Sequence, residues 1–167
     1  VTAGILEAFQ KGRNPAWSAI DYTVLAVNLA ANCGWILASH YRQVARSLVL
    51  MLVILASLVF LEERRYAASR APAPDLGTAR RFFLSTPINV YLGWISVATI
   101  ANVTALLVSS GWDGFGLDAR VWTVIVIAAG LAVGLVLAFA RKAIAAPLVI
   151  VWAYAGIVIK RAGVDPA

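Results

Sequence analysis

The chain has 167 residues, of which 62% are hydrophobic and only 13% are charged, and its mean hydropathy is +0.84. A soluble domain is nearer half apolar and a quarter charged, so this composition excludes a water-soluble protein and predicts one that lipid solvates. The net charge of +6 does not indicate a nucleic-acid partner, because the basic residues are dispersed and lie at the ends of apolar runs.

Five apolar runs are long enough to cross about 30 Å of hydrocarbon, which takes roughly twenty helical residues. They predict helices over residues 20–39, 44–61, 86–108, 121–140 and 144–160. The connections after the first and the fourth run are very short, so each pair is expected to form an antiparallel hairpin. The polar segment 62–82 has prolines and mixed charges, and we expect it to be a solvated loop. The predicted fold is an all-α, polytopic transmembrane bundle.

The chain does not begin with methionine, and its first ten residues, VTAGILEAFQ, show no signal-peptide pattern. They have the composition of the end of a longer helix. We therefore expect the N-terminal helices of the natural protein to be missing from this chain.

The basic residues also predict an orientation, because cytoplasmic loops of membrane proteins are enriched in Lys and Arg. On one side lie the segment before the first helix, the 62–82 segment and the connection between the last two helices. This side holds Lys11, Arg13, Arg64, Arg65, Arg70, Arg80, Arg81, Arg141 and Lys142. The other side holds only Arg42, Arg46, Arg120, Lys160 and Arg161. The 62–82 segment is therefore predicted to face the cytoplasm or its organellar equivalent.

Two glycine patterns have structural interpretations. The segment GWDGFG (111–116) lacks the strand, helix and lysine of a phosphate-binding loop and is expected to be a turn. Gly130 and Gly134 form a GxxxG pair, which lets two membrane helices approach closely. The pattern predicts packing without naming the partner helix.

The residues that carry most catalytic chemistry are scarce in this chain. There is one histidine, His40, and one cysteine, Cys33, so neither a metal-ligand cluster nor a catalytic triad is expected. The acidic residues lie outside the centres of the apolar runs, which disfavours an ion-coupled transporter. His40 lies at a helix end, where contact with water or headgroups is favoured over axial ligation of a tetrapyrrole metal. We expect no enzyme activity, no catalytic residues and no metal site.

Polar side chains form stripes on two of the predicted helices. In YLGWISVATIAN (91–102) and the residues before it, one helical face holds Pro87, Tyr91, Trp94, Ala98 and Asn102. Residues 20–39 carry a matching stripe of Asn28, Asn32 and Trp35. An amide that faced lipid would lose its hydrogen-bond partners at a cost of several kcal/mol. The stripes therefore face protein or a ligand, and both a hydrogen-bonded seam and a binding pocket fit them.

The spacing Tyr91-x2-Trp94-x3-Ala98-x3-Asn102 resembles the last-helix signature of the tryptophan-rich sensory protein family, also called the translocator protein or peripheral benzodiazepine receptor family. Asn32-x2-Trp35 resembles the Asn-x-x-Trp of that family's middle helix. The resemblance covers roughly residues 1–108 and is closest to a longer, diverged branch. It implies a family-like bundle over residues 1–110, partial at its N-terminus, and a two-helix transmembrane extension over residues 111–167.

The resemblance also implies a function. Members bind flat hydrophobic ligands, chiefly porphyrins and other tetrapyrroles, as sensors or carriers. Carried over residue by residue, the pocket candidates are Asn32, Trp35, Tyr91, Trp94, Ala98 and Asn102. Aromatic rings would stack on a macrocycle and the amides would hold its polar edge. No cofactor is required on this interpretation, and the expected ligand is a porphyrin, a chlorophyll-type pigment or a lipid. The expected location is a bacterial inner membrane or an organellar membrane.

A second hypothesis belongs to another class of protein. The chain would be a non-catalytic accessory subunit of a larger membrane complex, photosynthetic or respiratory. The polar stripes would then be packing seams or contacts with pigment and lipid. Expected partners are membrane lipids together with either a tetrapyrrole-like small molecule or other subunits, and the assembly is a homodimer or a larger membrane complex.

Overall fold

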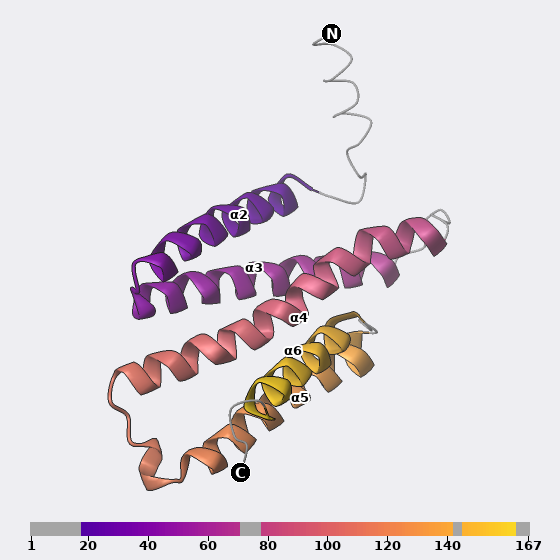
Figure 1. Ribbon diagram of the computed structural model, residues 1–167. Helices are drawn as coiled ribbons and strands as arrows, with labels where there is room; N and C mark the ends of the chain where they lie inside the picture. The colour runs from indigo at the N-terminus through magenta and orange to yellow at the C-terminus, as the bar shows by residue number, and fades with distance from the viewer. Residues whose placement is uncertain (1–17, 71–77, 142–144, 163–167) are drawn as a thin grey trace.

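The protein is described by a computed structural model, which describes residues 18–70, 78–141 and 145–162 (Figure 1). Within these ranges the chain forms the long helices α2 (Ala19–His40), α3 (Val44–Arg70), α4 (Thr78–Ser109), α5 (Ala119–Arg141) and α6 (Ala145–Ala162), with the short 3-10 turn η1 (Gly114–Gly116). By length and composition, α2 to α5 each contain a stretch able to cross a membrane, whereas α6 has a shorter apolar stretch, Ala145–Ile159. The prediction of an all-α membrane bundle is confirmed.

The helices pack in an order that follows the chain with one exception. α2 packs on α3, α3 packs on α4, and α4 then packs mainly on α6, with α5 on the outside of this last pair (Figure 1). Both short connections join antiparallel neighbours, as the sequence predicts. α4 and α6 run parallel, because Gly93 lies against Ala146 while Ile100 and Tyr154 both lie beside Gly130.

The prediction that residues 62–82 form a loop is wrong for most of that range. α3 continues to Arg70 and α4 already begins at Thr78; only residues 71–77 fall outside the described part of the chain. The charges that suggested a loop have helical spacing instead: Glu62 and Arg65 form an ion pair one turn apart. Polar composition alone therefore misidentified a helix end that extends beyond the apolar span.

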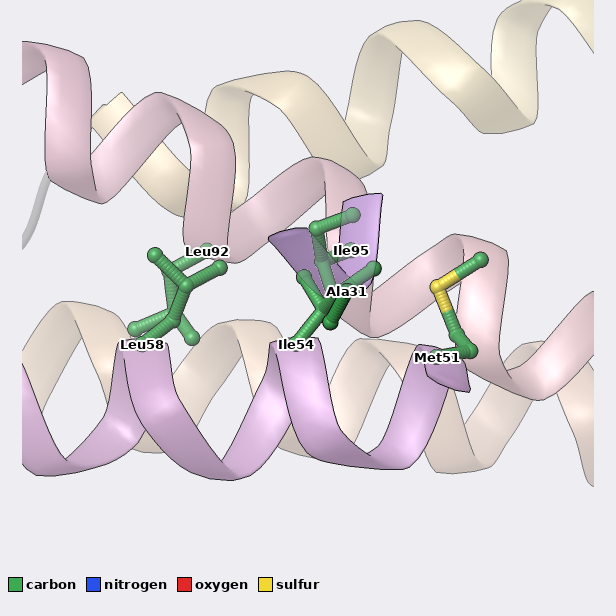
Figure 2. Packing of buried hydrophobic residues seen from close by; sticks show 6 residues of the cluster. All are labelled: Ala31, Met51, Ile54, Leu58, Leu92 and Ile95. Carbon is green, nitrogen blue, oxygen red and sulfur yellow. The ribbon is translucent and has the colours of Figure 1, made fainter. Parts of the chain in front are cut away.

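The core of the bundle lies where α3 meets α2 and α4. Met51, Ile54 and Leu58 of α3 are almost fully buried, and Figure 2 shows them with Leu92 and Ile95 of α4 and Ala31 of α2. The three α3 residues are spaced three and four apart, which gives them one face of the helix. The outer faces of α5 and α6 instead expose large apolar side chains such as Val124, Phe139 and Val158. Such surfaces suit contact with lipid.

Glycines set the contacts of α6. A Cβ on Gly93 would lie 2.5 Å from the carbonyl oxygen of Ala146, so the backbones of α4 and α6 meet at this point. Gly130 and Gly134 of α5 also face α6, against Tyr154 and Ile150 respectively. The partner of the GxxxG pair, which the sequence left open, is a helix of the same chain.

The segment GWDGFG forms the predicted turn. Gly111, Gly114 and Gly116 all have positive φ, and a Cβ on Gly114 would lie 2.7 Å from Nε1 of Trp122. That indole N–H donates to the carbonyl of Gly114 at 2.7 Å. Around this bond the rings of Trp112, Phe115 and Trp122 pack edge to face or tilted. An aromatic cluster at this position suits the membrane interface.

Candidate functional site

The centre of the predicted polar stripes is a contact between α2 and α4. Nδ2 of Asn32 donates a hydrogen bond to the phenolic oxygen of Tyr91, and both side chains are partly buried. Few backbone positions of α2 and α4 come close to each other, so this side-chain bond is a principal link between them. The amide that was predicted to avoid lipid thus finds a protein partner.

Trp35 and Ala98 complete this region. Together with Tyr91 they pack against the hydrophobic core formed by α2, α3 and α4. Nε1 of Trp35 is buried and has no hydrogen-bond partner within the described structure. A buried indole N–H without an acceptor carries a desolvation cost of about 1–3 kcal/mol. A ligand atom that accepted this hydrogen bond would therefore be bound favourably. We call Asn32, Trp35, Tyr91 and Ala98 the α2–α4 seam.

Asn102 belongs to a separate hydrogen-bonded chain near one end of the bundle. Its Oδ1 accepts from Oγ of Ser47 at 3.0 Å, and its Nδ2 donates to the carbonyl of Ala98 at 2.9 Å. Ser47 in turn lies 3.2 Å from Oγ of Ser39. One side chain from each of α2, α3 and α4 is therefore joined in a line. The amide of Asn102 is used for helix packing in this structure.

Trp94 lies apart from the seam. Its side chain is 47% exposed, and its ring faces Trp152 of α6 with the centroids 6.1 Å apart. The sequence grouped Trp94 with Tyr91 because three residues span most of a helical turn. Three residues turn the helix by about 300°, which leaves the two side chains about 60° apart around the axis. This difference is enough to direct the two rings to different neighbours. The structure therefore links Asn32 to Tyr91 and packs Trp35, Tyr91 and Ala98 against the same core. It bonds Asn102 to Ser47 and directs Trp94 toward Trp152.

A charged cluster at the other end of the bundle was missed by the sequence interpretation. Nε of Arg64 donates to Oδ1 of Asp21 at 2.9 Å, which ties α3 to α2. Asp21 also forms a capping box with Ser18 at the start of α2. The capping pair Ser18 and Asp21 could have been recognised in the sequence, since Ser-x-x-Asp before an apolar run is an N-terminal helix signature.

The same turn of α3 also holds α4. Glu62 is only 2% exposed and is paired with Arg65, whose Nε donates to its Oε2 at 2.8 Å. The amide of Asn89, with its nitrogen turned toward Glu62, donates to both carboxylate oxygens at 3.3 and 3.1 Å. Because the carboxylate is paired and hydrogen-bonded, its burial at this level of the bundle is compensated.

A further buried amide links α2 to the middle of α3. Nδ2 of Asn28 donates to the carbonyl of Ile54 at 3.1 Å and to Oγ of Ser57 at 2.6 Å. Its Oδ1 is buried and accepts no hydrogen bond from the described residues. This part of the α2 stripe is therefore a packing contact with α3.

The single histidine and the other residue types that bind metals form no cluster in the described part of the chain. His40 is exposed and packs edge to face on the ring of Tyr41, with the centroids 5.1 Å apart. Among the described residues there is no group of three or more His, Cys, Asp or Glu side chains placed to hold a metal ion.

Comparison with protein families gives one match. The model of the family described as TSPO-like protein matches residues 3–167, and so runs through α5 and α6 as well as the seam. Comparison with curated proteins and with solved structures returns no match. With a family match over nearly the whole chain and four helices long and apolar enough to span a bilayer, this is an integral membrane protein that belongs to the TSPO-like family.

Proposed function

We propose that the protein binds a planar, hydrophobic, tetrapyrrole-like ligand at the α2–α4 seam, and that it acts as a sensor or carrier and not as an enzyme. The observation that supports this most directly is the buried indole N–H of Trp35, which has no acceptor among the described residues. The hydroxyl oxygen of Tyr91 accepts from Asn32, so its own proton is available to a second acceptor. These two donors, one from α2 and one from α4, thus belong to side chains that pack against the same core.

A porphyrin matches these groups in both shape and chemistry. Its flat macrocycle offers apolar area to the rings of Trp35 and Tyr91, and its carboxylates and ring nitrogens offer hydrogen-bond acceptors. A chlorophyll-type pigment shares the ring, and a lipid shares only the apolar part. This proposal requires no cofactor besides the ligand itself. Membrane lipids are the constant partners on this proposal.

The test uses the full chain in lipid nanodiscs, titrated with protoporphyrin. We expect saturable binding beyond that of protein-free discs. Trp35→Phe and Tyr91→Phe each remove one donor and keep the ring, and each should weaken binding about five-fold. Trp112→Phe, in the turn between α4 and α5, is the matched control and should bind as the parent does. Equal affinity in the parent and in the doubly substituted seam variant would refute the seam as the site.

An accessory subunit of a larger photosynthetic or respiratory complex is the other candidate. The GxxxG pair on α5, which would suit contact with another subunit, packs against α6 of the same chain. The two candidates predict different behaviour on native gels of solubilised membranes. Migration as a free monomer or homodimer supports the ligand-binding proposal, and comigration with a pigmented complex supports the accessory role.

A further inference from the structure

We propose that Trp94 and Trp152 form a second binding site, separate from the α2–α4 seam, for a membrane-dissolved planar ring that carries carbonyl acceptors. A quinone headgroup has this chemistry. The two indoles come from different helices, lie 6.1 Å apart between centroids and are inclined by 45°. They are 47% and 68% exposed, so both rings present area to whatever surrounds the bundle.

The depth of these rings sets them apart from ordinary interfacial tryptophans. Trp94 lies about 12 Å along the axis from Thr86, where the apolar span of α4 begins, and Trp152 about 10 Å from the start of α6. Because α4 and α6 run parallel, the two rings lie at a similar depth inside a hydrocarbon layer about 30 Å thick. Tryptophan is enriched at the membrane surface, where its N–H meets water. The cluster of Trp112 and Trp122 occupies such a position, and the Trp94–Trp152 pair does not.

The indole N–H groups supply the second argument. Neither Trp94 nor Trp152 donates a hydrogen bond to any residue of the described ranges. In hydrocarbon such a donor has no water to turn to, which is costly. Because an indole N–H lies in the plane of its ring, carbonyl acceptors would take these hydrogen bonds at the ring edges, and the apolar part of the occupant would contact the exposed indole carbons. An acyl chain offers neither acceptors nor a flat surface, so a ring with two carbonyl oxygens fits better.

The two helices that carry the indoles also carry small residues. Gly93 brings the backbone of α4 against Ala146, which fixes the helices next to the two indoles. One helical turn after Trp152 along the chain, Gly156 faces open space, with nothing within 4 Å of an added Cβ. Ala101 on α4 is likewise small and exposed. The open space at Gly156 leaves room on α6 one turn from Trp152.

The test compares two ligands of the same shape. Radiolabelled anthraquinone and anthracene share three fused rings, and only anthraquinone has the two carbonyl acceptors. Each is titrated against the full chain in nanodiscs, with protein-free discs subtracted. We expect saturable binding of anthraquinone at least ten-fold tighter than that of anthracene. Trp94→Phe and Trp152→Phe keep a ring but lose the N–H, and each should weaken anthraquinone binding about five-fold.

Controls separate this site from the seam and from other occupants. Trp112→Phe and the seam variant Tyr91→Phe should leave anthraquinone binding unchanged, and Trp152→Phe should leave protoporphyrin binding unchanged. Three results would overturn the proposal: equal binding of anthracene and anthraquinone, full binding in the Trp94→Phe/Trp152→Phe variant, or a change of oligomeric mass by light scattering in that variant. The last result would assign the pair to contact with a second copy of the chain.

Discussion

Asn32 of α2 and Tyr91 of α4, separated by 59 residues in sequence, are joined by a direct hydrogen bond between their side chains. Hydrogen-bonded links at two other levels join these two helices through α3: the Asp21–Arg64 and Glu62–Asn89 contacts at one end, and the Ser39–Ser47–Asn102 line near the other. The Asn32–Tyr91 bond lies between these levels, where few backbone positions of α2 and α4 are close. It is therefore the contact whose loss should separate α2 from α4 most directly.

Tyr91→Phe is expected to lower the free energy of unfolding by about 0.5–1.5 kcal/mol, because hydrogen bonds between membrane helices contribute modestly. The measurement is reversible unfolding in mixed detergent micelles. Tyr41→Phe is the matched control, since Tyr41 is 69% exposed at the end of α2. Equal destabilisation by both substitutions would show that the contact with Asn32 contributes nothing.

Gly93→Ala is expected to destabilise the packing of α6 on α4. The new methyl group would lie 2.5 Å from the carbonyl oxygen of Ala146, and backbone at that distance has to move. Overpacking of this kind costs about 1–3 kcal/mol, which a thermal melt in detergent resolves. The control is Gly156→Ala, where the added carbon meets nothing within 4 Å. A melting temperature unchanged by Gly93→Ala would contradict the close approach of the two helices.

Asp21 and Arg64 are expected to be energetically coupled. Arg64→Gln leaves the buried carboxylate of Asp21 without its cationic partner, so it should lower the melting temperature more than Asp21→Asn does. The Asp21→Asn/Arg64→Gln double variant should lose less stability than the sum of the two single variants. Strict additivity of the three melting-temperature shifts would argue that the pair does not tie α3 to α2.

The orientation of the bundle is a prediction from charge. The start of α2, the end of α3, the start of α4 and the end of α5 share one end of the structure (Figure 1). In the sequence, most of the Lys and Arg residues precede α2, follow the apolar part of α3, begin α4 or end α5, so this end should face the cytoplasm or its organellar equivalent. In a Cys33→Ser background, Ala67→Cys should react with a membrane-impermeant maleimide only from that side, and Ser110→Cys only from the other. Labelling in the reverse pattern would invert the assignment.

The sequence predicted the helices where apolar length was the only requirement. α2, α5 and the apolar parts of α3 and α4 lie within a few residues of their expected bounds, because a membrane span needs about twenty consecutive apolar residues. It failed at Glu62, Arg64 and Arg65, whose charges were interpreted as loop. Their helical conformation depends on partners on other helices, Asp21 and Asn89, and neither partner is adjacent in sequence.

The candidate site shows the same division. Helical periodicity by itself determined that Asn32, Trp35, Tyr91, Trp94, Ala98 and Asn102 would not all face lipid, because buried amides need partners. Only the tertiary structure decided which partner each one has. The position of α3 gave Asn102 a bond to Ser47, and the close contact of α6 at Gly93 brought Trp152 to Trp94. A helical repeat fixes the direction of a side chain around its own axis, but the neighbour in that direction depends on how the helices pack together.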